Sequence, residues 1–494
     1  MCCHGPCPAK LASCTVHNCQ QQHLTEPLRD CASTSALLVT RVAGLPRLLG
    51  RPGRPGLRGG ISCATTNENC CISFGNNLGP IFECLVEVKV AALQHRDVAG
   101  GGMYVGLGGV ALTYLRMAQQ VQRGFSYAHG AYLRKHSVGR CLDIAASLLA
   151  EAEQLMASKR VTFLEGASGL LAAQALLAHM QGEHSTKEAK IRELEALWGS
   201  RIAGTLPDSE CELLYGRAGY LYSLAWLQVQ LGPGTISSQL TLGVVRHLLD
   251  EGMIGAAQLR QEQGGSGSSS SSSSSSSASW GLMYSWHGKR YLGAAHGLCG
   301  IVYMLLHCMD QVQQLDRQAA AAGAPAAGGV GMYSQAVRQT VDALAAAALP
   351  SGNLPTKLGE TQDLRLSWCH GAAGYVLTML KAADILGDLG GRYSTAAAAA
   401  GEDIWSRGLL KKGVGLCHGI SGNGYALLAL ARATGEARWL SAAQAFALYA
   451  ARNWEQLAEL PDRPASLFEG LAGAVNFWLD VVDHQHSRWP GAEL

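Results

Sequence analysis

The sequence predicts an all-α protein, a closed α/α toroid (barrel) of seven helical-hairpin repeats with inner and outer helix rings. A G-x-x-G motif recurs seven times, and each copy is followed by an apolar stretch without proline. Helices that are apolar nearly all round are typically buried, so these stretches predict the inner ring. The first glycines of the seven motifs are Gly106, Gly166, Gly216, Gly297, Gly371, Gly419 and Gly470.

The spacing of the motifs supports a hairpin repeat. Successive first glycines are separated by 60, 50, 81, 74, 48 and 51 residues, and about 50 residues is the size of one helical hairpin. The intervening segments, such as Cys141 to Ala157, are amphipathic and predict outer helices. An open stack would need polar caps at both ends, which favours closure. A glycine at the start of each inner helix would let backbones approach closely near the axis.

Two stretches stand apart from the repeats. Residues 1–74 mix Cys, Pro, Gly and Arg, with seven Lys or Arg against three Asp or Glu, and we interpret them as a flexible or targeting arm. Residues 264–279 contain ten consecutive serines, which cannot bury enough apolar surface to offset their ordering entropy. The sequence therefore predicts a toroid over residues 75–494 with a low-complexity serine-rich insertion.

Composition excludes several classes of protein. A chain that is 48% hydrophobic and 15% charged is not disordered, and a formal charge of +2 argues against a nucleic-acid-binding body. No apolar run is long enough to cross a bilayer, although peripheral membrane association stays open. Only six of 16 cysteines follow residue 84, which suits a reducing compartment. We expect a cytoplasmic monomer, or an organelle protein if the Arg-rich arm is a transit peptide.

Residues that immediately precede the motifs are candidates for chemistry, because inner helices that start on one rim would bring them together. Five of these seven residues are His or Glu, which is unexpected for positions that only pack. The seven residues are Val105, Glu165, Tyr215, His296, His370, His418 and Glu469.

Two of the repeats add a cysteine and indicate a metal site. Repeats five and six read Cys369-His370-Gly and Cys417-His418-Gly. Zinc binds thiolate and imidazole, and a catalytic zinc keeps three protein ligands and one open position. Cys369, Cys417 and one histidine would make such a set. The alternative is that both cysteines are small buried hydrophobic residues at a helix contact.

These motifs resemble the lanthionine synthetase C-like proteins, the eukaryotic relatives of bacterial lantibiotic cyclases. The resemblance runs from about Gly75 to the end of the chain and implies a seven-fold α/α toroid with one bound zinc ion. It is carried by Ala295-His296-Gly297, Trp368-Cys369-His370-Gly371, Lys411-Lys412-Gly413, Gly415-Leu-Cys-His-Gly419, Gly422-Asn423 and Ser466-Leu-Phe-Glu-Gly470.

The resemblance also implies roles for individual residues. The family's zinc ligands fall on Cys369, Cys417 and His418, its proposed acid/base histidine on His296, and a lysine that helps hold glutathione on Lys412. The implied reaction is Michael addition of a glutathione or peptide thiol to dehydroalanine or dehydrobutyrine in a protein or peptide, which forms a thioether.

Further residues complete the predicted site. Arg365, four residues before Cys369, would offset negative charge on glutathione or on the enolate. His370 is grouped with the catalytic residues, although a supporting role beside the metal is favoured over ligation. Glu459 stands where some animal relatives place an arginine for glutathione, and Arg463 is the residue that would substitute.

The alternative function is a binding protein. Zinc and the rim would then hold glutathione or a partner protein without turnover, as in a signalling adapter or receptor. The joint presence of Cys369, Cys417, His418 and His296 favours the enzyme, because a scaffold needs neither an open metal position nor an acid.

Overall fold

The computed structural model describes residues 98, 100–124, 137–156, 159–264, 279–323, 330–458 and 460–494. Across these ranges the secondary structure is helical, and no β-strand forms. The arm predicted for residues 1–74 and the run of ten serines lie outside the described residues. None of the described helices is both long and apolar enough to cross a membrane.

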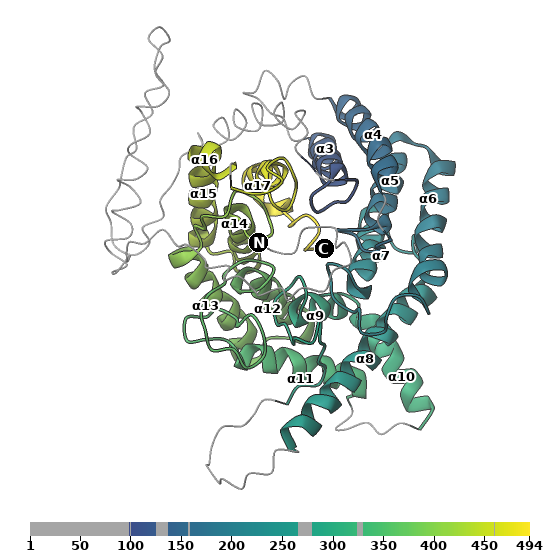
Figure 1. Ribbon diagram of the computed structural model, residues 1–494, viewed down its shortest axis with the longest axis vertical. Helices are drawn as coiled ribbons and strands as arrows, with labels where there is room; N and C mark the ends of the chain where they lie inside the picture. Colours follow the sequence, from purple (N-terminus) through teal and green to yellow (C-terminus); the bar gives the residue numbers. More distant parts are fainter. Residues whose placement is uncertain are drawn as a thin grey trace, which may run out of the picture.

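Seven helices form an inner ring, and the ring closes. Neighbouring inner helices pack against one another in chain order, and the seventh returns to pack against the first (Figure 1). This closure confirms the predicted α/α toroid. The inner helices are α3 (Leu107–Gln122), α5 (Ala167–Gln181), α7 (Arg217–Leu231), α9 (Leu298–His307), α12 (Ala372–Leu386), α14 (Ile420–Thr434) and α17 (Leu471–Val482).

Outer helices alternate with the inner ones along the chain. Each buries one face; in α4, for example, the buried positions are Cys141, Leu142, Ala145, Leu149 and Ala152. The outer helices are α4 (Val138–Leu155), α6 (His184–Leu197), α8 (Ser238–Gly264), α11 (Met332–Ala346), α13 (Arg392–Arg407) and α15 (Ala437–Arg452). Short helical turns complete the outer layer at Trp198–Ile202, Leu389–Gly391 and α16 (Trp454–Ala458), whereas the turn at His484–His486 follows α17 and packs against α14 and α17.

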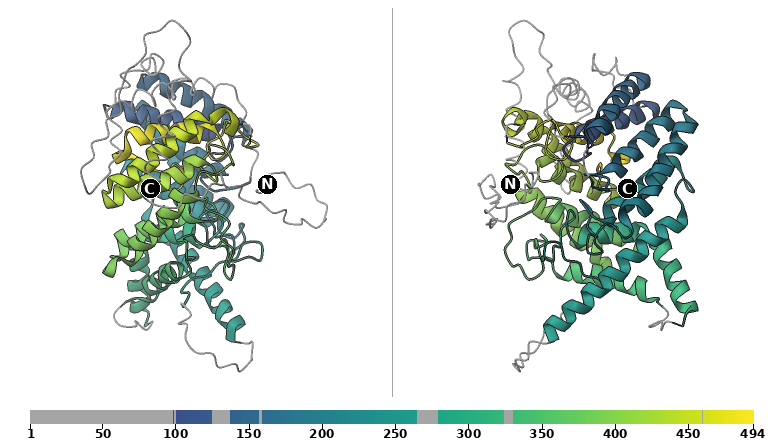
Figure 2. Two further views of the ribbon diagram at one scale, coloured as in Figure 1. Left: turned by 90° about the vertical axis from the view of Figure 1, so that its left-hand side faces the viewer. Right: turned by 45° about the vertical axis from the view of Figure 1, so that its right-hand side comes forward.

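The fourth repeat departs from the predicted single hairpin. A further helix, α10 (Met309–Ala321), begins directly after α9 and precedes α11, so this repeat supplies two helices outside the inner ring. The insertion explains the 74-residue step between the fourth and fifth motifs. Figure 2 shows the long teal helix α8 extending beyond the ring.

The motif glycines allow backbone segments to approach closely at the start of each inner helix. The first glycine of each motif is the N-cap of its inner helix, and a Cβ there would collide with the loop that leads into the helix. On Gly371, for example, the added Cβ would lie 1.8 Å from the carbonyl oxygen of Arg365. The second glycine of the fifth motif also lies against the neighbouring repeat, since a Cβ on Gly374 would sit 2.7 Å from Cβ of Ala294. The close approach is therefore between helix and loop, and it draws adjacent loops together.

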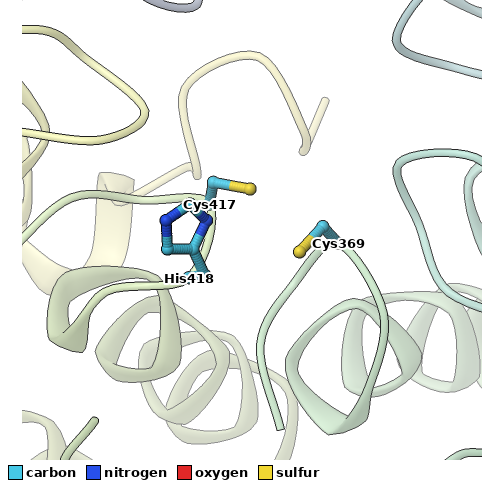
Figure 3. A group of neighbouring side chains, drawn as sticks. All are labelled: Cys369, Cys417 and His418. Carbon is cyan, nitrogen blue, oxygen red and sulfur yellow. The ribbon is translucent and has the colours of Figure 1, made fainter. Parts of the chain in front are cut away.

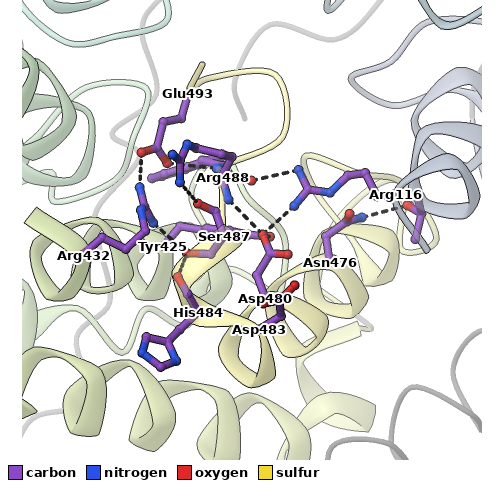
Figure 4. Close-up of polar contacts among 12 residues, drawn as sticks. Arg116, Tyr425, Arg432, Asn476, Asp480, Asp483, His484, Ser487, Arg488 and Glu493 are labelled. Carbon is purple, nitrogen blue, oxygen red and sulfur yellow. Dashed lines mark hydrogen bonds and ion pairs between the residues drawn. The ribbon is translucent and has the colours of Figure 1, made fainter. Parts of the chain in front are cut away.

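The C-terminal segment enters the centre of the ring (Figures 1 and 4). Arg116 of α3 donates to the carbonyl of Arg488 at 2.8 Å, and Tyr222 of α7 donates to the carbonyl of Glu493 at 3.0 Å. Arg432 of α14 pairs with the Glu493 carboxylate. Trp489 is fully buried in this segment. The segment thus ties together inner helices that are far apart in the sequence.

Candidate metal centre and active site

The loops that precede the inner helices join into a continuous ring, here called the rim. Seven rim residues occupy one equivalent position, two residues before the first motif glycine. They are Tyr104, Leu164, Leu214, Ala295, Cys369, Cys417 and Phe468.

Hydrogen bonds link these rim residues from repeat to repeat. Backbone N–H to carbonyl bonds join Tyr104 to Leu164 (2.8 Å), Leu214 to Ala295 (3.1 Å), Ala295 to Cys369 (3.3 Å), Cys417 to Phe468 (2.7 Å) and Phe468 to Tyr104 (3.0 Å). Between repeats two and three, the Thr162 hydroxyl donates to the Leu214 carbonyl at 2.7 Å. Hydrogen bonds therefore link the rim loops at six of the seven junctions between neighbouring repeats.

The seventh junction lies between Cys369 and Cys417, and side chains meet there instead. No backbone hydrogen bond joins these two residues, both of which lie in the described part of the chain. Both thiols and one imidazole nitrogen of His418 lie within 4.8 Å of one another (Figure 3). Both cysteines are buried, and His418 is partly buried. The structure thus brings together the three residues predicted as zinc ligands.

The chemistry of this cluster fits a zinc ion. The hydrogen bond with Cys417 is the main cause that holds the pKa of the Cys369 thiol well below its usual range, with His370 and His418 acting in the same direction against burial. Nδ1 of His418 is buried and has no hydrogen-bond partner. Two thiols and an imidazole are ligands that zinc prefers, and a three-residue set leaves one position for a substrate or water.

The other buried cysteines behave as core residues. Burial raises the pKa of Cys141 to about 11 and that of Cys211, Cys299 and Cys308 to about 12. Cys299, three residues after His296, packs inside α9. Among the described residues, only Cys369, Cys417 and His418 form a group that could hold a metal ion.

His296 is held at the rim by a carboxylate and a tryptophan. Its Nδ1 lies 3.0 Å from Oε2 of Glu212, which also accepts a hydrogen bond from the backbone N–H of Leu214 at 2.8 Å. The Trp286 ring stacks on the imidazole with centroids 3.9 Å apart and planes within 3°. A carboxylate oxygen can only accept, so Nδ1 is the donor and Nε2 is left for acid/base chemistry.

His370 connects this histidine to the metal cluster. Its ring centroid lies 6.0 Å from that of His296, and its neighbour in the chain is Cys369. Burial lowers the pKa of His370 to about 4; the nearby charge of Arg365 lowers it further, whereas Cys369 opposes the shift. His370 is therefore neutral near pH 7. Arg365 is half-buried and close enough to His370 to act on it electrostatically.

Comparison with known proteins assigns the chain to a family. The sequence model described as "Lanthionine synthetase C-like protein" matches residues 97–494. The chain belongs to this family.

Individual relatives agree with that assignment. The "Glutathione S-transferase LANCL1" of Danio rerio is 31% identical over 88% of this chain and 96% of its own length. The "LanC-like protein GCL1" of Arabidopsis thaliana is 31% identical over 82% of this chain and 84% of its own length. Among solved structures, "Nisin cyclase" has a similar fold, with a TM-score of 0.54 and 16% identity over 82% of this chain and 96% of that one.

The predicted glutathione residues of this lanthionine synthetase C-like chain lie on neighbouring loops. Lys412 is half-buried, five residues before Cys417. Arg463 is exposed, and its guanidinium donates to the carbonyl of Asp462 at 2.9 Å. Glu459 lies outside the described residues. The glutathione-binding roles of Lys412 and Arg463 stay predictions.

Sequence reasoning missed part of the site in this family member. Glu212 and Trp286 are immediate partners of His296, and Tyr291 lies beside both His296 and His370, with ring centroids 6.1 Å and 5.6 Å away. Glu212 stands four residues before the motif glycine Gly216, so a comparison of the seven motifs could have singled it out. Trp286 lies in an irregular loop that carries no repeat signal.

Proposed function

We propose that this protein is a zinc-dependent transferase that joins the thiol of glutathione to dehydroalanine or dehydrobutyrine residues in proteins or peptides. The observation that carries the proposal is that the cluster of Cys369, Cys417 and His418 shares one rim with a histidine oriented by a carboxylate, His296. His370 lies next to Cys369 in the chain and 6.0 Å from His296 between ring centroids. The Danio rerio relative bears the name glutathione S-transferase, which supports glutathione as the thiol. The substrate that accepts the thiol is proposed from the chemistry of the site.

The chain supplies three ligands for the proposed zinc. Cys369, Cys417 and His418 would hold the ion and leave a fourth position open. A bound zinc ion would favour the thiolate form of an incoming thiol and fix its sulfur. Arg365 would offset the negative charge that develops on the carbonyl oxygen of the acceptor. Lys412 and Arg463 would bind the glutathione carboxylates.

His296 would supply the proton that the addition requires. In the reaction the sulfur bonds to the β-carbon, the carbon–carbon double bond is lost, and the α-carbon takes up a proton. Nδ1 of His296 is tied to Glu212, so Nε2 is the atom that would protonate the α-carbon. The proton released by the thiol balances the proton gained by carbon, so no oxidant or reductant is needed.

A direct assay tests this proposal. Purified protein is incubated with zinc, glutathione and a dehydroalanine peptide, and the peptide mass is followed for addition of one glutathione. Cys417→Ala should lose both zinc and adduct formation. Cys308→Ala is the matched control, because Cys308 is a buried thiol outside the metal cluster, and it should retain both.

Two results would contradict the proposal. The site assignment fails if Cys417→Ala keeps its full zinc content and its full adduct formation. If wild-type protein binds zinc and glutathione yet forms no adduct, the site is one for binding, as in an adapter or receptor.

A further inference from the structure

A tryptophan of the C-terminal segment packs inside the ring beside the one rim junction that has no hydrogen bond between its loops. This junction lies between Cys369 and Cys417, both of which belong to the described part of the chain. Trp489 contacts the chain on both sides of it. The separation of the two cysteine loops therefore depends on packing inside the ring.

On the side of the fifth repeat, Trp489 meets the residue that precedes Cys369. The rings of Trp489 and Trp368 lie 6.2 Å apart between centroids, and neither side chain is more than 1% exposed. Trp368 also makes an edge-to-face contact with Phe468, with centroids 5.3 Å apart. Because a protein interior is close-packed, a displacement of the Trp368 ring is passed on to the adjoining cysteine.

On the side of the sixth repeat, Trp489 packs on the first turns of α14, which begins two residues after His418. Tyr425 of this helix stacks on Trp489 with centroids 5.7 Å apart and planes at 25°. A Cβ added to Gly422 would lie 3.1 Å from Cζ2 of Trp489, so the indole lies against the helix backbone. One side chain thus contacts both elements that present the metal cluster.

Glu493 holds Trp489 in place. The Glu493 carboxylate accepts a hydrogen bond from the backbone N–H of Trp489 at 3.0 Å, and the backbone N–H of Glu493 donates to the Trp489 carbonyl at 3.0 Å. Arg432 of α14 pairs with the same carboxylate (Figure 4), and Tyr222 of α7 donates to the Glu493 carbonyl at 3.0 Å. The turn that carries the indole is therefore tied to two inner helices that are not neighbours in the ring.

We propose that Trp489 is a positioning residue of the metal centre. It holds the Cys369 loop and the start of α14 at the separation that lets both thiols and His418 bind one metal ion. Hydrogen bonds link the rim loops at the other six junctions, and here the packed indole takes their place. This inference rests on the metal site of the proposed function.

The geometry of zinc explains why the separation matters. Zinc holds sulfur at about 2.3 Å and imidazole nitrogen at about 2.0–2.1 Å. The ligand atoms of the cluster lie within 4.8 Å of one another. If the two loops move apart, one ion can no longer reach all three ligands at these distances, and zinc binding weakens.

The test removes the indole from the full chain and measures zinc affinity by competition with a chromophoric chelator. Trp489→Leu keeps an apolar side chain that is too small to contact both loops. Trp439→Leu is the matched control, because Trp439 is only 2% exposed but packs in the outer layer, against Gly401 of α13. We expect zinc affinity to fall about 10–100-fold in Trp489→Leu, as when other supports of metal ligands are removed. Trp439→Leu should bind zinc like wild type.

A milder pair of variants keeps the test decisive if Trp489→Leu does not fold. Glu493→Gln preserves side-chain volume but weakens the pair with Arg432, and it should lose zinc affinity to a smaller extent. Glu402→Gln is its control, because it weakens an exposed pair with Arg438, and it should lose none. Urea unfolding of the metal-free proteins measures the stability of all four variants.

A spectroscopic readout separates positioning of the ligands from general destabilisation. With Co²⁺ in place of zinc, the visible absorption typical of tetrahedral cobalt should weaken in Trp489→Leu and persist in Trp439→Leu. The inference is overturned if Trp489→Leu, or Glu493→Gln where the former does not fold, binds zinc as tightly as wild type. It is also overturned if Trp439→Leu loses as much affinity as Trp489→Leu. In these cases the proposed function stands as long as wild type binds zinc and forms the adduct. If wild type binds no zinc, both fall.

Discussion

Glu212 accepts a hydrogen bond from Nδ1 of His296 at 3.0 Å, with a side chain that is only 2% exposed. Its two oxygens also accept from the backbone N–H groups of Leu214 and Tyr215, so the carboxylate is held from three directions. Trp286 covers one face of the imidazole. Together these contacts fix both the orientation of His296 and the nitrogen that carries its proton.

Replacement of this carboxylate should impair the chemical step. Glu212→Gln offers one accepting oxygen in place of two, so the three donors can no longer all be satisfied as before. We expect adduct formation to slow by about 10²–10⁴-fold, the usual contribution of a positioned acid or base, with unchanged zinc content. The assay is the rate of mass gain beside metal analysis. A rate within twofold of wild type would show that the Glu212 carboxylate does not support the acid/base role of His296.

The role of the motif glycines predicts opposite effects for two Gly→Ala changes. A Cβ at Gly374 would lie 2.4 Å from the carbonyl oxygen of Trp368, so Gly374→Ala should destabilise the protein by about 1–3 kcal/mol or more through overpacking. Gly243 lies inside helix α8 with no atom within 4 Å of the added carbon. Gly243→Ala should stabilise by about 0.5–1 kcal/mol. Urea unfolding of both variants measures these changes in stability. Equal changes in the free energy of unfolding would contradict the close contact between helix and loop at Gly374.

Loss of the buried ion pair inside the ring should lower the free energy of unfolding far more than loss of an ion pair on the surface. Arg116 lies 2.5 Å from Asp480, whose side chain is 4% exposed and also accepts from Tyr425 at 2.8 Å. Asp480→Ala would leave a partly buried charge without its partner, and we expect a loss of about 3–5 kcal/mol. Glu402→Ala breaks an exposed pair with Arg438 and should change stability by at most about 1 kcal/mol. Similar losses in the two variants would show that the ring interior is well solvated.

A histidine at the end of α9 predicts a pH dependence of stability. Burial lowers the pKa of His307 to about 4, and nearby Lys381 adds to the shift. The unfolded chain, with a pKa of about 6.5, then binds a proton between pH 6.5 and 4 that the folded chain does not. Stability should therefore fall on the order of 1–2 kcal/mol as the pH drops from 7 to 5. His307→Gln should flatten this fall in urea unfolding, and an unchanged slope would contradict the assignment.

Much of the fold could be predicted because its signal is local and repeated. The seven G-x-x-G motifs and their apolar helices predicted the ring, since helix periodicity and glycine spacing depend only on residues close in the chain. Cys369, Cys417 and His418 were predicted as ligands because the C-H-G tripeptide occurs twice and because the family resemblance assigned them. The extra helix α10 carried no repeat signal and was missed.

Contacts between residues far apart in the sequence were decided by closure of the ring alone. Glu212 and His296 are 84 residues apart, and Arg116 and Asp480 are 364 apart, so no local pattern relates them. The rim is closed because the backbone N–H of Phe468 in the seventh repeat donates to the carbonyl of Tyr104 in the first. By itself the sequence determined the seven inner helices and which motif residues approach the rim. Closure decided which side chains meet there, because a hydrogen bond depends on distance in space and its partners are set only once the last helix packs on the first.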